Sequence, residues 1–128
     1  MTEASTHYLR KHDNISLFPQ DRCIHHFVEE QALVRANAVA LIDRCKTYTY
    51  EKVNQRANQV ARYIHSLNLP EESIIAVMFD RSAEMIYSML GVLKAGHAFL
   101  PIDPDYPSER INYVLADSQA ALLITHSN

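Results

Sequence analysis

Residues 93–107 constrain the fold of this 128-residue chain more than any other stretch, because they combine a helix end, a strand and a turn. Gly96 is expected just past the end of a helix, where a left-handed backbone strains any residue with a side chain. Residues 98–102 are apolar enough for a covered strand, and Pro101 marks the end of that strand or an edge of its sheet. Residues 103–107 hold two aspartates and two prolines, which predict a rigid turn.

The clearest helix is predicted over residues 53–67, where apolar side chains recur with a period of about 3.6 residues. The expected buried positions are Val53, Ala57, Val60, Ala61, Ile64 and Leu67. Residues 73–79 follow as an unbroken apolar run, which predicts a strand covered on both faces. Ser82 is then expected to cap a helix that ends at Ala95, just before the strand over residues 98–102.

The segments on either side continue the pattern. Asp21 is expected to cap a first helix, with Ile24, Phe27 and Val28 on its buried side. Residues 39–42 and 47–49 then predict two strands joined by a turn.

At the other end, Ser108 is expected to cap a helix over residues 108–117, which leads to a strand over residues 120–125. Repeated helix-then-strand alternation with apolar strands predicts an α/β fold with a mainly parallel sheet and helices packed on it. A doubly wound fold would continue beyond that strand into another helix, so we expect this chain to be an incomplete portion of such a fold.

Composition excludes several classes of function. The net charge is −3 and basic residues are scattered, which argues against a nucleic-acid partner. No stretch approaches the roughly 18 apolar residues of a membrane span. Residues 1–20 are polar, do not form a secretory signal, and are interpreted as a linker or flexible arm. Cys23 and Cys45 lack the spacing of a zinc site, and we expect two thiols in a reducing cytoplasm.

The sequence assigns no catalytic, cofactor-binding or metal-binding residue. Gly91 and Gly96 are its only glycines, too few for a phosphate loop. His25 with Glu29, and His26 with Glu30, have a spacing that a metal can use, but a third ligand is missing nearby. We therefore expect these pairs to be surface contacts.

Three other polar residues invite a functional interpretation. His97 lies where it can line the mouth of a cleft, although a residue that simply begins a strand is the favoured interpretation. Asp103 and Asp105 suggest a cation, but the flanking prolines and the missing glycine do not suit a calcium loop. We expect these two aspartates to form turns and to cap a helix.

Two motifs carry a resemblance to a known family. Residues 93–107 closely resemble the second core motif of adenylation domains in nonribosomal peptide synthetases. Residues 48–53, which read Y-T-Y-E-K-V, resemble the first core motif, usually written L-T-Y-x-E-L. Further similarity extends over about residues 15–128. The chain departs from the family pattern at Lys52, which replaces a glutamate, and at Asn68 and His97, where glycine is common.

The resemblance implies that residues 21–128 are part of an adenylation domain, an incomplete portion of the large N-terminal subdomain of an adenylate-forming enzyme. Such an enzyme uses ATP and Mg to convert an amino acid into an aminoacyl adenylate, which then passes to the thiol of a phosphopantetheinyl carrier protein. The family's phosphate loop, substrate pocket and catalytic lysine come later in such enzymes. We therefore expect this fragment to bind no cofactor and to be inactive alone, with the remainder of the adenylation domain as its partner.

Other interpretations stay open at this point. Acyl-CoA synthetases share the fold and the first half-reaction, and a non-catalytic remnant or interaction module would keep the same fold. The activated amino acid cannot be named, because the pocket-lining segment has no counterpart in these residues.

Overall fold

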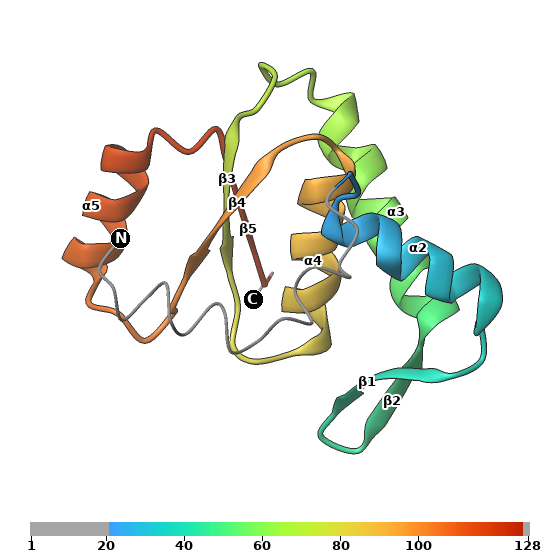
Figure 1. Ribbon diagram of the computed structural model, residues 1–128. Helices are drawn as coiled ribbons and strands as arrows, with labels where there is room; N and C mark the ends of the chain where they lie inside the picture. Colours follow the sequence, from blue (N-terminus) through green and yellow to red (C-terminus); the bar gives the residue numbers. More distant parts are fainter. Residues whose placement is uncertain (1–20, 127–128) are drawn as a thin grey trace, which may run out of the picture.

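The computed structural model describes residues 21–126 as helices packed against a parallel sheet, with a separate antiparallel hairpin (Figure 1). The predicted linker or arm over residues 1–20 lies outside the described residues. In chain order the elements are α2 (Ile24–Val34), β1 (Val39–Asp43), β2 (Lys46–Thr49), α3 (Tyr50–Ser66), β3 (Ile74–Met78), α4 (Ala83–Lys94), β4 (Ala98–Ile102), α5 (Ser108–Ser118) and β5 (Leu122–Thr125).

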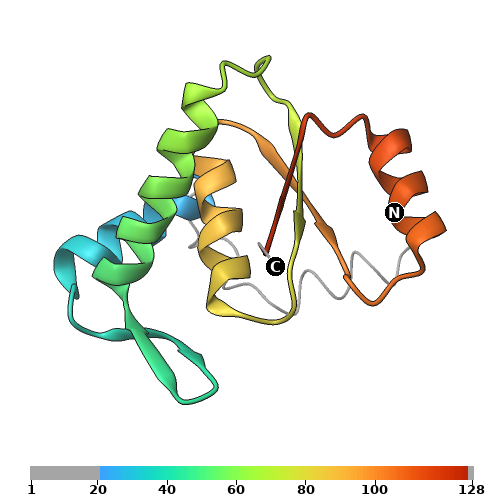
Figure 2. The ribbon, with the colours of Figure 1, turned by 180° about the vertical axis from the view of Figure 1, so that it is seen from behind.

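The parallel sheet has the strand order β4-β3-β5, which confirms the predicted α/β fold. The chain leaves the central strand β3, forms α4 and returns as β4, and then crosses through α5 to β5 on the other side of β3. Because the two crossovers run in opposite directions along the sheet, right-handed connections place their helices on opposite faces. Figures 1 and 2 show α3 and α4 on one face and α5 on the other.

Pro101 lies within β4, opposite Val77 of β3. Since β4 is at the edge of the three described strands, a residue without an amide proton is tolerated there. The second of the two sequence expectations for this proline, an edge of the sheet, is therefore confirmed.

The main core lies between the sheet and the α3–α4 layer. Its buried members are Ile64, Ile75, Val77, Phe79 and Val92. On the other face Ile74 and Leu123 each remain 37% exposed, because α5 buries none of its own residues against the sheet. Ala76, which shares that face of β3 with Ile74, is nevertheless fully buried. The expectation that β3 is covered on both faces is therefore confirmed for the middle of the strand, and Ile74 at its start is left exposed.

Gly91 sets how closely α3 and α4 approach each other. A Cβ atom added to Gly91 would lie 2.6 Å from the Cβ of Val60 and 2.9 Å from the carbonyl oxygen of Ala57. Only hydrogen fits there, so this glycine is a packing residue at the crossing of two helices.

Several helix ends are stabilised as their sequences predict. The Oγ of Ser82 accepts a hydrogen bond from the amide of Met85 at 3.3 Å, which confirms it as the cap of α4. Gly96 has a φ of +82°, the left-handed value expected past the end of that helix.

Two predicted caps are wrong. Helix α2 begins at Ile24, so Asp21 lies two residues before the capping position, which Cys23 occupies. The amide of Cys23 donates to Nδ1 of His26 at 3.2 Å, and Ile24, predicted to be buried, is exposed in the first turn.

In α5, Ser108 is the first helical residue and Pro107 holds the cap position. Pro107 has a ψ of 143°, which is not helical, so the helix begins directly after it, one residue earlier than a cap at Ser108 would allow. Its carbonyl oxygen accepts the amide of Ile111 at 3.1 Å.

Candidate functional site

A cavity of about 440 Å³ lies at the carboxyl ends of β3 and β5. Open parallel sheets generally bind ligands at this edge, so it is the natural candidate site. Three segments form its wall: the tip of the β1–β2 hairpin, the residues that lead from β3 into α4, and the residue after β5. The lining residues are Asp43, Arg44, Cys45, Lys46, Tyr48, Asp80, Arg81, Ser82, Glu84 and His126.

The first turn of α4 faces this cavity but is already engaged by the protein. The Oδ2 atom of Asp43 accepts the amide of Ala83 at 3.0 Å, and Ser82 accepts the amide of Met85. These two contacts use helix amides that would otherwise be available to a phosphate group. Sequence reasoning missed Asp43, because it lies 40 residues from Ala83.

The remaining charges of this cavity are of both signs. Arg44, Lys46 and Arg81 are offset by Asp80 and Glu84, so the lining does not strongly favour anions. The His126 ring packs edge-on against Phe79, with 4.7 Å between ring centroids. The residues that line the cavity are polar or charged. Among the described residues, no hydrogen bond joins a nucleophilic side chain of this lining to a base.

The residues present do not fit Mg and ATP. Within residues 21–126, no three His, Cys, Asp or Glu side chains are placed to hold a metal ion together. Gly91 lies at the contact between α3 and α4. Gly96 precedes β4 and therefore lies at the opposite end of the strands from this cavity. Neither glycine allows a backbone loop to close around phosphate.

The two glutamates of the predicted His–Glu pairs in α2 form ion pairs with a lysine and an arginine. Glu29 meets Lys94 of α4, with 2.5 Å between Oε1 and Nζ, and the Lys94 side chain is only 6% exposed. Glu30 pairs with Arg22 at 2.8 Å. Glu29 and Lys94 are 65 positions apart in the chain, so no local pattern in the sequence predicts their contact.

This contact shifts the pKa of a carboxyl group. The hydrogen bond from Lys94 lowers the pKa of Glu29, more than partial burial raises it. Burial also lowers the pKa of His25, and the neighbouring His26 lowers it further. Both groups therefore bind protons more readily in the unfolded chain than in the folded one.

Acidification is expected to weaken the attachment of α2 through Glu29. Because the folded pKa of Glu29 lies below its ordinary value of 4.5, the ion pair stabilises the fold above that value and loses its effect as the pH falls through the folded pKa. His25 contributes its own loss below its ordinary pKa of 6.5. The variant Glu29→Gln should be less stable at neutral pH and should lose less stability on acidification, as measured by urea unfolding at several pH values.

Glu30→Gln is the matched control, because its partner Arg22 comes from the same short segment and the pair is more exposed. An equal acid response in both variants would contradict the role of the Glu29–Lys94 pair.

The two aspartates after β4 form a turn. The amide of Asp105 donates to Oδ1 of Asp103 at 2.9 Å, and the amide of Tyr106 donates to the carbonyl oxygen of Asp103 at 3.2 Å. The turn-forming role predicted for them is confirmed, whereas the cap of α5 comes from Pro107 instead.

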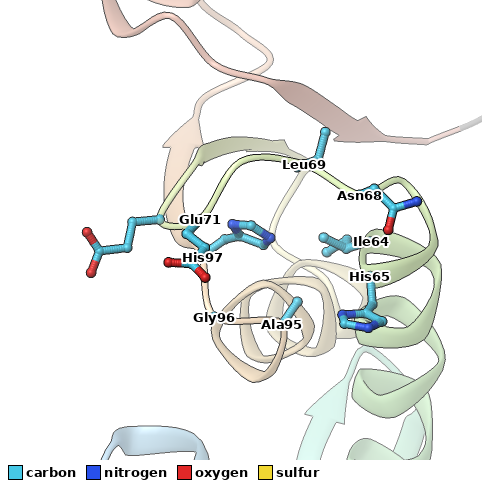
Figure 3. Close-up of a pocket in the computed structure, with 9 residues that line it drawn as sticks. Ile64, His65, Asn68, Leu69, Glu71, Ala95, Gly96 and His97 are labelled. Carbon is cyan, nitrogen blue, oxygen red and sulfur yellow. The ribbon is translucent and has the colours of Figure 1, made fainter.

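A second cavity, of about 620 Å³, lies at the amino ends of the strands (Figure 3). It is bounded by the ends of α3 and α4 and by the loops that lead into β3 and β4. His97 lines it, in agreement with one of the two interpretations of this residue from the sequence. The Nδ1 atom of His97 is buried and has no hydrogen-bond partner among the described residues.

The described part of the chain contains no helix that is both long and apolar enough to cross a membrane.

Comparisons with known proteins identify the family. The sequence model of the family described as AMP-binding enzyme matches residues 28–128. The chain is 44% identical over 127 residues to tyrocidine synthase 3 of Brevibacillus parabrevis, which covers 98% of this chain and 2% of that protein. It is 40% identical over 111 residues to gramicidin S synthase 1 of Brevibacillus brevis, covering 87% of this chain and 10% of the relative. The chain therefore spans only a small part of these relatives.

Solved structures share the fold. The N-terminal subdomain of Klebsiella oxytoca NpsA, in complex with 3-hydroxyanthranilyl-AMSN, superposes with a TM-score of 0.76 at 24% identity, covering 83% of this chain and 27% of that one. The nonribosomal peptide synthetase FmoA3 in its AMPPNP-bound form gives a TM-score of 0.77 at 23% identity, covering 80% and 11%.

Proposed function

Because this chain belongs to the AMP-binding enzyme family, we propose that it is the N-terminal portion of an adenylation domain that activates an amino acid for nonribosomal peptide synthesis. The observation that carries this proposal is the family match over residues 28–128, together with the 44% and 40% identity to two peptide antibiotic synthases. Residues 21–128 form the partial domain, and residues 1–20 form a linker that leads into it.

The complete protein joins the carboxylate of an amino acid to the α-phosphorus of ATP, and pyrophosphate leaves. The resulting aminoacyl adenylate then transfers its acyl group to the thiol of a phosphopantetheinyl carrier protein, and AMP leaves. Mg accompanies ATP in that enzyme, which works in the cytoplasm. None of the described residues takes part in these bond changes. Their contribution is the sheet edge and the α3–α4 layer on which the rest of the domain is built.

This proposal predicts a gain of activity when the segment is returned to a complete enzyme. Residues 21–128 replace the corresponding segment of an adenylation domain from tyrocidine synthase 3, which is 44% identical to this chain. We expect amino-acid-dependent exchange of pyrophosphate into ATP from the chimera, with the host's amino-acid preference unchanged, and no exchange from the 128-residue chain alone.

The control is the same chimera carrying Gly91→Leu, which should lose activity because it cannot pack α4 against α3. A chimera that folds, as judged by circular dichroism and gel filtration, but shows no exchange would contradict the proposal and favour a remnant.

A further inference from the structure

A groove of about 430 Å³ lies between β1 and the first turns of α4. Residues 41–44 line it on one side, and residues 81–83, 85 and 86 line it on the other. Side chains of consecutive strand residues point to opposite faces of a sheet, so a groove that four consecutive residues share lies along the edge of the strand. Among the described residues the lining takes none from β2, so this edge is the one that β2 leaves unpaired.

The free edge of β1 presents unpaired backbone groups. The β1–β2 hairpin projects away from the parallel sheet (Figures 1 and 2), and within residues 21–126 no third strand joins it. Asp43 and Lys46 pair across a two-residue turn, the position at which an antiparallel hairpin closes with hydrogen bonds. Because hydrogen-bonded and open pairs alternate, the amide and carbonyl of the next residue, Ile42, point away from β2. The edge can therefore accept an extended segment as a third strand.

The walls of the groove are mainly apolar, and one end is basic. Ile42 is 74% exposed, and Met85 and Ile86 of α4 are half-buried. Arg44 and Arg81 line the end at the hairpin tip. Both arginines are exposed, and neither forms an ion pair with another described residue. The groove therefore fits an extended segment that has alternating apolar side chains and a carboxylate at one end.

Residues 13–18, which read D-N-I-S-L-F, have this pattern. Ile15 and Leu17 are two positions apart and would share one face of a strand, Asp13 supplies the carboxylate, and Pro19 would end the strand. The likeness to tyrocidine synthase 3 covers 98% of this chain, so it includes most of residues 1–20 as well as the described fold.

The segment is tethered within reach of the groove. Val28 of α2 belongs to the same apolar cluster as Leu41 and Ile86, which line the groove. Val28 lies only four residues into α2, about 6 Å along the helix axis from its start. The seven residue steps from Leu17 to Ile24 span up to about 24 Å when extended, which is enough to bring the segment to the groove.

We propose that residues 13–18 bind in this groove as a third strand, antiparallel to β1. Ile15 and Leu17 cover Ile42 and the apolar wall that α4 provides, and backbone hydrogen bonds join the segment to the free edge. The segment thereby straps the hairpin to α4. This inference does not depend on the proposed adenylation function.

The charges set the direction of the strand. Asp13 lies at the basic end of the groove, where β1 ends, so the segment runs opposite to β1. The same direction carries Arg10 and Lys11 past the hairpin tip, toward the neighbouring cavity that Asp80 and Glu84 line.

The test is NMR of the 128-residue chain with ¹³C-labelled methyl groups. We expect nuclear Overhauser effects from the methyl groups of Ile15 and Leu17 to those of Ile42 and Ile86. A sample that mixes labelled and unlabelled chains separates contacts within one chain from contacts between copies. The absence of these effects would overturn the proposal, and so would effects seen only between copies, which would assign the edge to a second copy of the chain.

Hydrogen exchange of the Ile42 amide tests the strand pairing. The double variant Ile15→Asp with Leu17→Asp places charges against the apolar wall, and we expect it to raise the exchange rate about tenfold. Ser16→Asp is the matched control, because it adds a charge on the opposite face of the same segment and should change the rate little. None of these positions lies in the described core, so the fold is retained. Exchange rates that are equal in the double variant and the control would contradict the docked strand.

A charge reversal tests the direction. Asp13→Lys should raise the exchange rate of the Ile42 amide about threefold at low salt, because it places a cation beside Arg44 and Arg81. Glu3→Lys makes the same change of charge outside the segment and should have no effect. Equal rates in these two variants would overturn the antiparallel placement.

Discussion

The variant Ile75→Ala is expected to lower the free energy of unfolding by about 3 kcal/mol. Ile75 is fully buried in the central strand β3 and faces the α3–α4 layer, among the largest buried side chains of the protein. Truncation removes apolar contacts and leaves a cavity that the neighbouring strands cannot close, because both are held to β3 by ladder hydrogen bonds. Urea unfolding followed by circular dichroism measures the loss.

Ile74→Ala supplies the matched control, since it deletes the same atoms one residue away. Ile74 points to the α5 face and is 37% exposed, so its truncation should cost only about 1 kcal/mol. Equal losses for the two variants would mean that the α5 face is as well covered as the α3–α4 face, contrary to the structure.

Gly91→Ala is expected to destabilise the protein by about 2 kcal/mol, the typical cost of overpacking a close contact. The sign is the informative part, because replacing a helical glycine by alanine ordinarily stabilises a protein by about 0.5–1 kcal/mol. Here the new Cβ meets the Val60 side chain at 2.6 Å and the Ala57 carbonyl oxygen at 2.9 Å, so α3 and α4 must move apart. The free energy of unfolding in urea is again the measurement.

The double variant Gly91→Ala with Val60→Ala should recover part of this loss, because the second change removes Val60 Cγ1, one of the two Val60 atoms 2.6 Å from the added Cβ. The recovery is partial because the Cβ at position 60 and the Ala57 carbonyl oxygen remain. Gly96→Ala serves as the comparison. It has no atom within 4 Å of its added Cβ, so any cost comes from its positive φ, and Val60→Ala should not relieve it. A neutral or stabilising Gly91→Ala would show that the two helices separate freely.

Much of the fold follows from local sequence patterns. The 3.6-residue period of α3 predicts its inner face, and Val53, Ala57 and Ile64 are indeed its buried residues. The prediction is wrong for Leu67, which lies just past the end of the helix and is 38% exposed. The apolar run of β3 predicts a covered strand, and Pro101 predicts either the end of a strand or an edge of the sheet. The order β4-β3-β5 confirms the edge position for β4. These properties depend on residues a few positions apart, so a pattern within one segment contains them.

Local patterns are less informative about how segments end and how well they are covered. Asp21 and Ser108 have the chemistry of caps, yet the backbone enters each helix at another residue. The exposure of Ile74 depends on how closely α5 approaches the sheet. That distance cannot be predicted from the residues of β3 alone.

The sequence by itself determined that no glycine-rich phosphate loop exists in this chain, since two glycines are too few, and its motifs indicated the family. Tertiary structure alone decided what single residues do. In the folded protein Gly91 lies where α3 and α4 are in closest contact. Lys94 forms an ion pair with Glu29, and Asp43 accepts a hydrogen bond from the start of α4. The tertiary structure also gathered Asn68 and His97 around one cavity. Each of these contacts joins residues far apart in the chain, and their distances are fixed only when the helices and strands pack.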